Sequence, residues 1–344
     1  MKILIHYQPK ARHAAFEGTR LRKTLKGQCE SEEITWVDSP ASEPDIAHLM
    51  SPRDEALLAD MRWRHVPVIV SAFYCENDPS ARFFETKAKD GTPTLSKRAL
   101  RFLNHADWIL VPNEELRKIA IGQGVSAPIE VAEPSVNLAR FVDNAMEKDI
   151  FPRYFGIRPG QAIAVACGSY QDKTVIKRMM AIAKLCPEIQ FYFFGSARGL
   201  FSTGTVAAHY NRQAPANLKF ESIVEDDVYR SAQIRADYYL SLSPEHPDSV
   251  FLLEAFAAKT QVLGYGKQKK EPLLIDGKTG YLYDDVESLS EGLRSFYRGE
   301  GKSTIITAYS VAKEHALSSG AAQLRAVYEK LLENKNSKKE DIHD

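Results

Sequence analysis

Residues 237–285 read DYYLSLSPEHPDSVFLLEAFAAKTQVLGYGKQKKEPLLIDGKTGYLYDD and contain every element of one αβ unit. The apolar residues 238–242 predict a buried strand, and a polar loop broken by two prolines follows it. A helix is predicted to begin at Asp248 or Ser249, because either side chain can accept a hydrogen bond from the first helical N–H groups. A short strand at 261–264, a glycine-containing turn and a further strand complete the unit, which predicts a parallel α/β fold.

In this unit the C-terminal end of a buried strand meets the N-terminus of a helix, with acidic side chains at the junction. Ligands of open α/β sheets bind at that edge, and free helix N–H groups attract phosphate or sugar oxygens. We therefore interpret the junction as a candidate binding site. A strand–loop–helix unit that binds nothing would have the same local pattern, so that alternative stays open.

The segments SPEHPDSVFLLEAFAAKTQVLGYG and LLIDGKTGYLYDD resemble the donor-site segment of the retaining glycosyltransferases of family 4, which have the GT-B fold. In that family a loop glutamate lies eight positions before a helix glutamate, and a DG-x-TG-x-L turn comes after the helix. Glu254 matches the helix glutamate. The residue eight positions earlier is His246, and Glu245 lies nine positions earlier, so the resemblance assigns the catalytic, sugar-reading role to one of these two.

The resemblance also assigns a donor-binding role to the start and middle of the helix. A carboxylate is an acceptor-only group, so Glu254 would accept hydrogen bonds from the ribose hydroxyls of a nucleotide-sugar. Asp248, Ser249 and Val250 lie where the helix N-terminus would meet the diphosphate. The alternative for Glu254 is an ordinary solvent-facing glutamate on a helix.

Two lysines near the start of the second half are candidate phosphate ligands. In metal-independent sites, cations and backbone N–H groups stabilise the charge of a departing diphosphate. The family places a basic pair after the strand that we predict at 162–167. Lys173 matches the first member, Thr174 occupies the second position, and Lys177 follows one helical turn later. The alternative for Lys173 is a solvated surface lysine.

The N-terminal half departs further from the family pattern. The loop AFYCENDP after the strand predicted at 66–71 resembles the acceptor-side loop of the family, which assigns Phe73, Glu76 and Asp78 to the acceptor side. Phe73 stands where the family has a histidine near the reacting sugar. Gly18 matches the glycine-rich loop near the donor phosphates, although a second glycine is absent, and its alternative is an ordinary glycine at a helix start.

These features lead to three hypotheses about activity. The first is a retaining hexosyltransferase that moves a sugar from a nucleotide-diphosphate sugar, such as a UDP-sugar, to a glycolipid or cell-envelope polysaccharide precursor. For it we expect the nucleotide-sugar as co-substrate, with no metal or other cofactor. The second, supported by the substituted motif residues, is a catalytically impaired relative that binds nucleotide or supports a partner enzyme. The third is a sugar-phosphate epimerase on the same fold.

Composition limits the class of protein. The 344 residues are 44% hydrophobic and 26% charged, which is typical of a soluble globular protein with two domains. The 45 Lys and Arg residues equal the 45 Asp and Glu residues, so no overall basic charge indicates nucleic acid binding. No apolar run has the length of a membrane span, and the four cysteines show no CxxC or zinc spacing; both observations favour the cytoplasm.

Alternating strands and helices in both halves predict two doubly wound, Rossmann-like domains that face each other across a cleft. We assign residues 1–140 to an N-terminal acceptor-side domain, 141–158 to a linker, and 159–315 to a donor-binding domain. Residues 316–344 are predicted to form a helix that returns to the N-terminal domain, followed by a charged tail.

Within family 4, the chain is loosely similar to the Gram-positive diglycosyl-diacylglycerol synthases, which work at the inner face of the plasma membrane. The similarity lies in CENDPSARF and in EKDIFPRYFGIRPGQ. The helix predicted at 16–28 carries Arg20, Arg22, Lys23 and Lys26, which favours peripheral contact with anionic lipid. The alternative is a helix face whose counter-ions lie elsewhere in the molecule.

Overall fold

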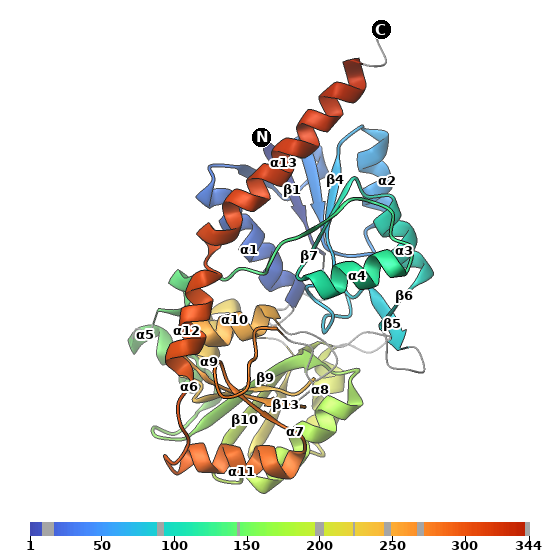
Figure 1. Cartoon of the computed structure of the whole chain (residues 1–344). Helices are drawn as coiled ribbons and strands as arrows, with labels where there is room; N and C mark the ends of the chain where they lie inside the picture. The colour runs from blue at the N-terminus through green and yellow to red at the C-terminus, as the bar shows by residue number, and fades with distance from the viewer. Residues whose placement is uncertain are drawn as a thin grey trace.

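The computed structural model describes residues 1–8, 17–87, 93–142, 145–196, 203–222, 224–243, 249–266 and 272–340. Within these ranges the chain forms two six-stranded sheets whose neighbouring strands run parallel. The two sheets lie in separate bodies stacked along the long axis of the molecule, with the N-terminal half in the upper one (Figure 1). The predicted α/β fold with two doubly wound domains is confirmed.

The first sheet has the strand order β2-β1-β3-β4-β7-β8. Its strands are β1 (Lys2–His6), β2 (Thr35–Val37), β3 (Ile46–Leu49), β4 (Val68–Ser71), β7 (Trp108–Val111) and β8 (Ile129–Val131). Its helices are α1 (Glu17–Ser31) and α13 (Leu317–Glu340) on one face, and α2 (Glu55–Trp63), α3 (Lys97–Asn104) and α4 (Glu114–Gly122) on the other. Both faces are covered, so β4 is buried along its whole length and consists of apolar β-branched residues up to its final serine.

The second sheet has the strand order β11-β10-β9-β12-β13-β14. Its strands are β9 (Ile163–Ser169), β10 (Gln190–Ser196), β11 (Leu218–Glu221), β12 (Tyr238–Ser241), β13 (Gln261–Tyr265) and β14 (Tyr281–Tyr283). One face is covered by α9 (Asp226–Arg235), α10 (Ser249–Ala257) and α12 (Ile305–Glu314), and the other by α7 (Lys173–Leu185), α8 (Thr203–Asn211) and α11 (Val286–Tyr297).

Each sheet begins in its interior and is extended first to one side and then to the other. The order reverses between β1 and β3 in the first sheet, and between β9 and β12 in the second. Such switch points open a crevice at the carboxyl ends of the strands. Helix α1 follows β1 and helix α10 follows β12, and the two helices contact each other across the domain border. The switch points of both sheets therefore lie at the border between the two domains.

Several short elements were not predicted. The strands β5 (Phe84–Lys87) and β6 (Pro93–Leu95) form an antiparallel pair. Their sequences are too short and too polar to predict strands. The helices α5 (Ala145–Lys148) and α6 (Ile150–Phe155) occupy most of the segment assigned to the linker. Phe151 of α6 is fully buried in the second domain, and its N–H donates to Ser231 Oγ at 2.8 Å. The assigned domain boundaries themselves stay predictions.

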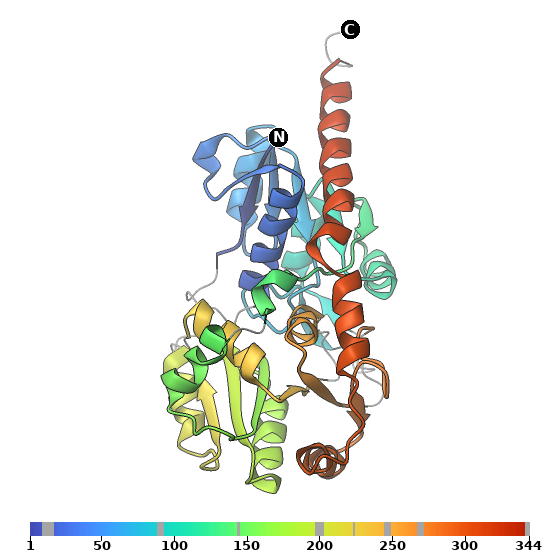
Figure 2. The same cartoon turned by 90° about the vertical axis from the view of Figure 1, so that its left-hand side faces the viewer.

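The chain crosses the domain border twice, and the two crossing segments are bonded to each other. The N–H of Val136, after β8, donates to the carbonyl of His315, between α12 and α13, at 2.8 Å. His315 Nδ1 lies 2.9 Å from the carbonyl oxygen of Pro134. Helices α12 and α13 then follow each other along one side of the molecule (Figure 2). No helix within the described ranges is long and apolar enough to cross a bilayer.

Helix α13 is fastened to the first sheet by apolar packing and by one buried hydrogen-bonded chain. Leu324, Val327 and Leu331 belong to the core beneath α1. Tyr328 Oη lies 2.7 Å from His48 Nδ1, and His48 Nε2 lies 2.8 Å from Ser71 Oγ. Burial lowers the pKa of His48 to about 3, so the imidazole is neutral at physiological pH.

Replacing Tyr328 with Phe is expected to lower the free energy of unfolding by about 1–3 kcal/mol, because Nδ1 of the buried His48 loses its partner. Chemical denaturation followed by circular dichroism at pH 7 measures this loss. Tyr297→Phe serves as the control, since the Tyr297 side chain is 47% exposed. Equal stability of Tyr328→Phe and the unmodified protein would contradict the role assigned to this chain of hydrogen bonds.

Candidate functional site

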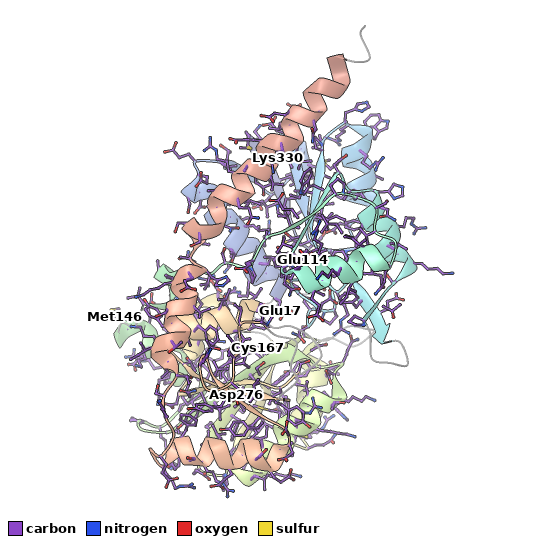
Figure 3. The ribbon with its side chains drawn as sticks, in the orientation of Figure 1. Glu17, Glu114, Met146, Cys167, Asp276 and Lys330 are labelled. Carbon is purple, nitrogen blue, oxygen red and sulfur yellow. The ribbon has the colours of Figure 1, made fainter. Side chains whose placement is uncertain are left out.

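A narrow crevice with a free volume of about 10 Å³ lies at the border between the two domains. Its walls come from α1, from the segment that follows β8, and from α10. The residues that line it are Lys23, Thr24, Ser135, Val136, Asn137, Arg140, Phe141, Val250 and Glu254. In Figure 3, Glu17 at the start of α1 and Cys167 of β9 lie on opposite sides of this border. The domains touch here, and charged groups from both of them meet.

Glu254 lies near the middle of α10, a helix whose residues are all buried. Its side chain is almost covered, with 6% of the residue exposed, and Tyr229 Oη donates to Glu254 Oε2 at 2.8 Å. Burial raises the pKa of Glu254, while the positive charges of Arg20 and Arg140 and the hydrogen bond from Tyr229 act against that rise. The predicted alternative of a solvent-facing glutamate does not fit this position.

Asp226, the first residue of α9, is the centre of a cluster of cations. Arg20 Nη2 lies 2.5 Å from Asp226 Oδ1, and Arg140 Nη2 lies 2.9 Å from Oδ2. Lys23 Nζ also donates to Oδ2. Burial alone would raise the pKa of Asp226, but the three cations outweigh it and hold this pKa well below its usual range. The carboxylate is therefore charged throughout the physiological range of pH.

Three buried carboxylates shape the loop that follows β4. Glu76 accepts hydrogen bonds from the N–H groups of Phe83 and Phe84, each at 3.1 Å. Asp78 accepts from the Gly18 N–H at 3.1 Å, from the Ser80 N–H at 2.8 Å and from the Tyr7 hydroxyl. These bonds use both carboxylates to tie the loop together and to join it to the start of α1.

The third carboxylate, Glu17, accepts from the main-chain and side-chain nitrogens of Asn77, each at 3.1 Å. Burial raises the pKa of Glu76 to about 7 and that of Asp78 to about 6, against the opposing effect of their hydrogen bonds. Both groups thus titrate near neutral pH, next to the domain border.

Phe73 and Gly18 are also fixed by packing in this region. Phe73 is buried and stacks on Phe84 with ring centroids 4.8 Å apart, and its backbone φ of 70° is rarely adopted by a bulky side chain. A Cβ on Gly18 would lie 2.4 Å from the ring of Tyr7, so a larger residue would displace that ring. The residues immediately before α1, which would complete a phosphate loop, lie outside the described ranges.

The predicted phosphate lysines lie on α7. Lys173 is its first residue, and both Lys173 and Lys177 are exposed. Asp172 caps this helix by accepting from the N–H groups of Thr174 and Val175 at 3.0 Å. The sequence interpretation missed the neighbouring Arg178, whose Nη1 donates to the Leu242 carbonyl at 3.0 Å and whose guanidinium lies 3.8 Å from the centroid of the Tyr265 ring.

The loop that was assigned to sugar recognition falls outside the described residues, and with it Glu245, His246 and Asp248. Ser249 and Val250 begin α10, and both are buried. The structure brings Val250 and Glu254 together in the crevice, places the two lysines on a separate helix of the same domain, and places Phe73, Glu76 and Asp78 in the other domain.

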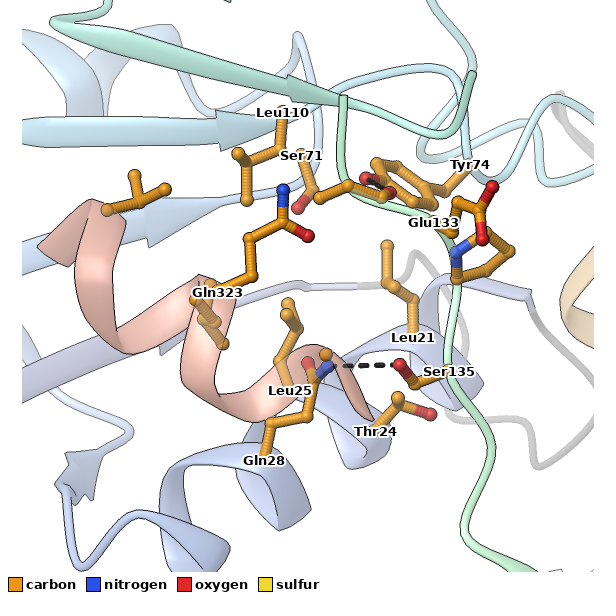
Figure 4. Close-up of a pocket in the computed structure, with 15 residues that line it drawn as sticks. Leu21, Thr24, Leu25, Gln28, Ser71, Tyr74, Leu110, Glu133, Ser135 and Gln323 are labelled. Atoms are coloured by element: carbon orange, nitrogen blue, oxygen red, sulfur yellow. Dashed lines mark hydrogen bonds between the residues drawn. The ribbon is translucent and has the colours of Figure 1, made fainter. Parts of the chain in front are cut away.

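A second cavity, of about 30 Å³, lies between α1, α13 and the segment after β8 (Figure 4). Leu21 and Leu25 of α1 and Leu110 of β7 line it together with the polar side chains of Gln28, Gln323 and Ser135, and it has room for a water molecule. Gln28 Nε2 donates to Ser135 Oγ at 3.1 Å. A Cβ on Gly320 would lie 2.5 Å from Gln28 Nε2, so a larger residue where α13 passes this bond would displace the Gln28 side chain.

Within the described ranges, no group of three or more His, Cys, Asp or Glu side chains is placed to bind a metal ion. The expectation of a metal-independent reaction stays a prediction, because the loop with Glu245, His246 and Asp248 is not among the described residues.

Comparison with known proteins gives one curated relative, and no family model matches the chain. The relative is the processive diacylglycerol alpha-glucosyltransferase of Acholeplasma laidlawii. It is 22% identical over 266 residues, which cover 76% of this chain and 78% of the relative.

Several solved structures match nearly the whole chain, and two of them serve as examples. HepE of Anabaena, solved with UDP and glucose, has a TM-score of 0.68 at 13% identity and covers 96% of this chain and 100% of its own. A glycosyltransferase of Rickettsia africae has a TM-score of 0.64 at 11% identity, with coverages of 97% and 99%. At these identities the likeness shows the fold, which is the GT-B fold expected from the sequence.

The Glu76 carboxyl is expected to make stability fall as the pH rises. Its pKa is about 7 in the folded protein and 4.5 ordinarily, so between these values the folded state keeps a proton that the unfolded chain has lost. This group lowers the free energy of unfolding by up to about 1.4 kcal/mol per pH unit across that window. Urea unfolding at several pH values between 4.5 and 7.5 measures the decline, which should be less steep in Glu76→Gln than in the unmodified protein.

Two other buried groups titrate in this window and are present in both proteins. Asp78, with a pKa raised to about 6, acts in the same direction as Glu76, whereas His48, with a pKa lowered to about 3, makes stability rise with pH. The difference between the variant and the unmodified protein therefore isolates Glu76. A difference that is constant from pH 4.5 to 7.5 would contradict the raised pKa.

Proposed function

We propose that this chain is a retaining hexosyltransferase that uses a nucleotide-diphosphate sugar, in particular a UDP-sugar. The observation that carries the proposal is the position of Glu254, the one charged residue of the buried helix α10, at the domain border and beside Arg20 of the N-terminal domain and Arg140 of the crossing segment. A buried carboxylate is costly, which is typical of a group retained for a ligand. Proteins of this fold bind UDP and glucose, and the curated relative is an alpha-glucosyltransferase.

The donor would bind mainly to the C-terminal domain. Glu254 accepts hydrogen bonds from the ribose hydroxyls, because a carboxylate offers two acceptor oxygens. The N–H groups at the start of α10, at Ser249 and Val250, face the diphosphate and attract its charge. Lys173 and Lys177 add positive charge near the same phosphates. Asp248 and either Glu245 or His246 contact the transferred sugar from the loop before α10.

The reaction exchanges one bond at the anomeric carbon for another. The bond from that carbon to the diphosphate oxygen breaks, and a bond to an acceptor hydroxyl oxygen forms on the same face of the sugar. The acceptor proton leaves with the departing nucleotide. The protein contributes by neutralising the charge that develops on the diphosphate, with cations and helix N–H groups rather than with a metal ion.

The acceptor would approach from the N-terminal domain, along the loop that contains Phe73, Glu76 and Asp78. The curated relative acts on diacylglycerol, so we propose a glycolipid or another cell-envelope precursor as acceptor, at the cytoplasmic face of the membrane.

A second candidate function is a nucleotide-binding protein without transferase activity. Phe73 packs in an aromatic cluster, and the carboxylates of Glu76 and Asp78 are occupied by hydrogen bonds within their own loop. None of these three side chains is therefore free to bind an acceptor. Release of UDP from a panel of UDP-sugars, with and without a diacylglycerol glycolipid, separates the two candidates.

Replacing Glu254 with Ala is expected to weaken UDP binding by about 1.5–3 kcal/mol, roughly ten- to hundredfold, because charge-assisted hydrogen bonds to the ribose are lost. Lys173→Ala should weaken UDP but leave uridine unchanged, since a lysine acts on the phosphates alone. Isothermal titration calorimetry measures both. Glu287→Ala, an exposed glutamate in the first turn of α11, is the control. Absence of UDP binding by the unmodified protein would refute the proposed function.

The basic residues of α1 predict contact with a membrane, but in the structure these residues are buried or paired with carboxylates. Arg20 is buried and Lys23 is bound to Asp226, while Arg22 and Lys26 both bind Asp38. On the same domain, Arg98 and Arg101 of α3 share the single carboxylate of Glu55, beside a groove of about 440 Å³. Trp63, at the end of α2, is 80% exposed. We therefore favour α2 and α3 for contact with anionic lipid.

Exchange of Arg98 and Arg101 for Glu is expected to weaken binding to vesicles of phosphatidylglycerol roughly five- to thirtyfold, because a cation near an anionic surface contributes about 1 kcal/mol. Co-sedimentation at two salt concentrations measures this loss, and the binding of the unmodified protein should fall as salt rises. The matched control exchanges Arg22 and Lys26 for Gln. If that control loses binding while the α3 variant retains it, the contact lies on α1 instead.

A further inference from the structure

Arg20 belongs to the N-terminal domain by sequence, yet its side chain is buried against the C-terminal domain. It extends from α1, its side chain has no exposed surface, and its Nη2 lies 2.5 Å from Asp226 Oδ1 of α9. Its guanidinium carbon lies 5.1 Å from the centroid of the Tyr229 ring, one turn further along α9. The contact thus joins two residues that lie more than 200 positions apart.

The same tyrosine connects Arg20 to the carboxylate of Glu254. The Tyr229 hydroxyl donates to Glu254 Oε2 at 2.8 Å, while the face of its ring meets the guanidinium. The other charged groups near Glu254 are Lys23 from α1, Arg140 from the crossing segment, and Asp226 from α9. Three cations thus lie beside two carboxylates, those of Asp226 and Glu254. The positive charge in excess of that of Asp226 stabilises the charged form of Glu254.

Few of the N–H groups of Arg20 have hydrogen-bond partners, which indicates that the positive charge of this residue contributes more at this position than its hydrogen bonds do. Only Nη2 has a partner, whereas Nε and Nη1 are buried without a hydrogen-bond partner among the described residues. Burying guanidinium N–H groups without partners is unfavourable, and an apolar side chain would avoid that cost. The favourable interaction of this positive charge with the nearby carboxylate of Glu254 offsets that cost.

We propose that Arg20 is a positioning residue for Glu254: supplied by the opposite domain, its guanidinium keeps the buried carboxylate charged and oriented when the two domains are closed. The inference rests on the proposed function, in which Glu254 binds the ribose. It also means that the donor site is completed by a residue outside the donor domain. Nucleotide recognition is thereby coupled to closure of the domain border.

The charge of Arg20 affects the pH at which Glu254 takes up a proton. Burial raises the pKa of Glu254, and the charge of Arg20 is the largest influence that opposes the rise. Without Arg20 the carboxyl would take up a proton nearer to neutral pH. A protonated carboxyl has lost its charge and much of its capacity to accept hydrogen bonds from a ribose.

The first experiment measures UDP affinity by calorimetry from pH 5.5 to 8.5. Arg20→Gln is expected to lose about tenfold in affinity between pH 8 and pH 6, since one proton changes binding by at most tenfold per pH unit, while the unmodified protein changes little. Arg20→Lys should restore the flat profile, because it restores the charge. Arg22→Gln is the matched control on the same helix, as Arg22 binds Asp38 within its own domain. Glu76 and Asp78 are present in all four proteins, so their titration cancels.

A purely structural role for Arg20 predicts other results. Arg20→Gln would then lose affinity by the same factor at every pH, or not at all, and Arg20→Lys would behave like Arg20→Gln. Either result overturns the inference while leaving UDP binding, and hence the proposed function, intact. If Arg20→Gln does not fold, Arg20→Met replaces it, because methionine keeps the aliphatic bulk that packs on Tyr229.

A second experiment needs no ligand and therefore tests Arg20 even if UDP does not bind. It measures melting temperatures for Glu254→Gln in the unmodified and Arg20→Gln backgrounds. At pH 8, Glu254→Gln should lower the melting temperature when Arg20 is present and raise it when Arg20 is absent, because the remaining cations, Lys23 and Arg140, then compensate the burial of the Glu254 charge less well. At pH 5 the difference between the backgrounds should shrink. Additive effects of the two substitutions at pH 8 would overturn the inference.

Discussion

Asp226 joins three parts of the chain through one carboxylate. It begins α9 in the C-terminal domain, and it binds Arg20 and Lys23 of the N-terminal domain together with Arg140 of the crossing segment. Breaking an ion pair in which one partner is fully buried leaves an uncompensated charge, which is far more costly than breaking a pair in water. The arrangement of the domains, and with it the crevice beside Glu254, depends on this contact.

The crossing segments make the same border rigid from the other side. The chain passes from the first domain to the second after β8 and returns between α12 and α13, and the two passages share hydrogen bonds at Val136 and His315. Helix α13 then packs on α1, the helix that carries Arg20 and Lys23. The ion cluster around Asp226 and the crossing segments therefore both fix the position of α1, which contacts both domains.

The two sides of the border use buried carboxylates for different purposes. In the N-terminal domain Glu76 and Asp78 accept hydrogen bonds from backbone N–H groups of their own loop, which fixes the shape of that loop. In the C-terminal domain Glu254 accepts a bond from a tyrosine hydroxyl and faces cations from another domain. The first arrangement is a scaffold. The second places a charged group at the domain border.

Much of the fold could be predicted because its signals are local. Strands such as β4 and β12 are short apolar runs bounded by polar residues, and α10 has an apolar sequence that starts after a polar, proline-broken loop. The antiparallel pair of β5 and β6 and the short helices α5 and α6 were missed, because elements of three to six residues are too short to establish a period. Helix α13 continues to Glu340, through a charged segment without apolar anchors in which the sequence predicts a tail.

The sequence by itself determined the order of the longer elements, the resemblance of the segment around Glu254 and the position of that residue on a helix. It did not determine what faces Glu254. Arg20, Arg22, Lys23 and Lys26 form one basic run in the sequence, yet helical geometry directs Arg20 and Lys23 to Asp226 at the domain border and Arg22 and Lys26 to Asp38. Which counter-ion each cation meets is decided by residues from distant parts of the chain, and only the tertiary structure brings those together.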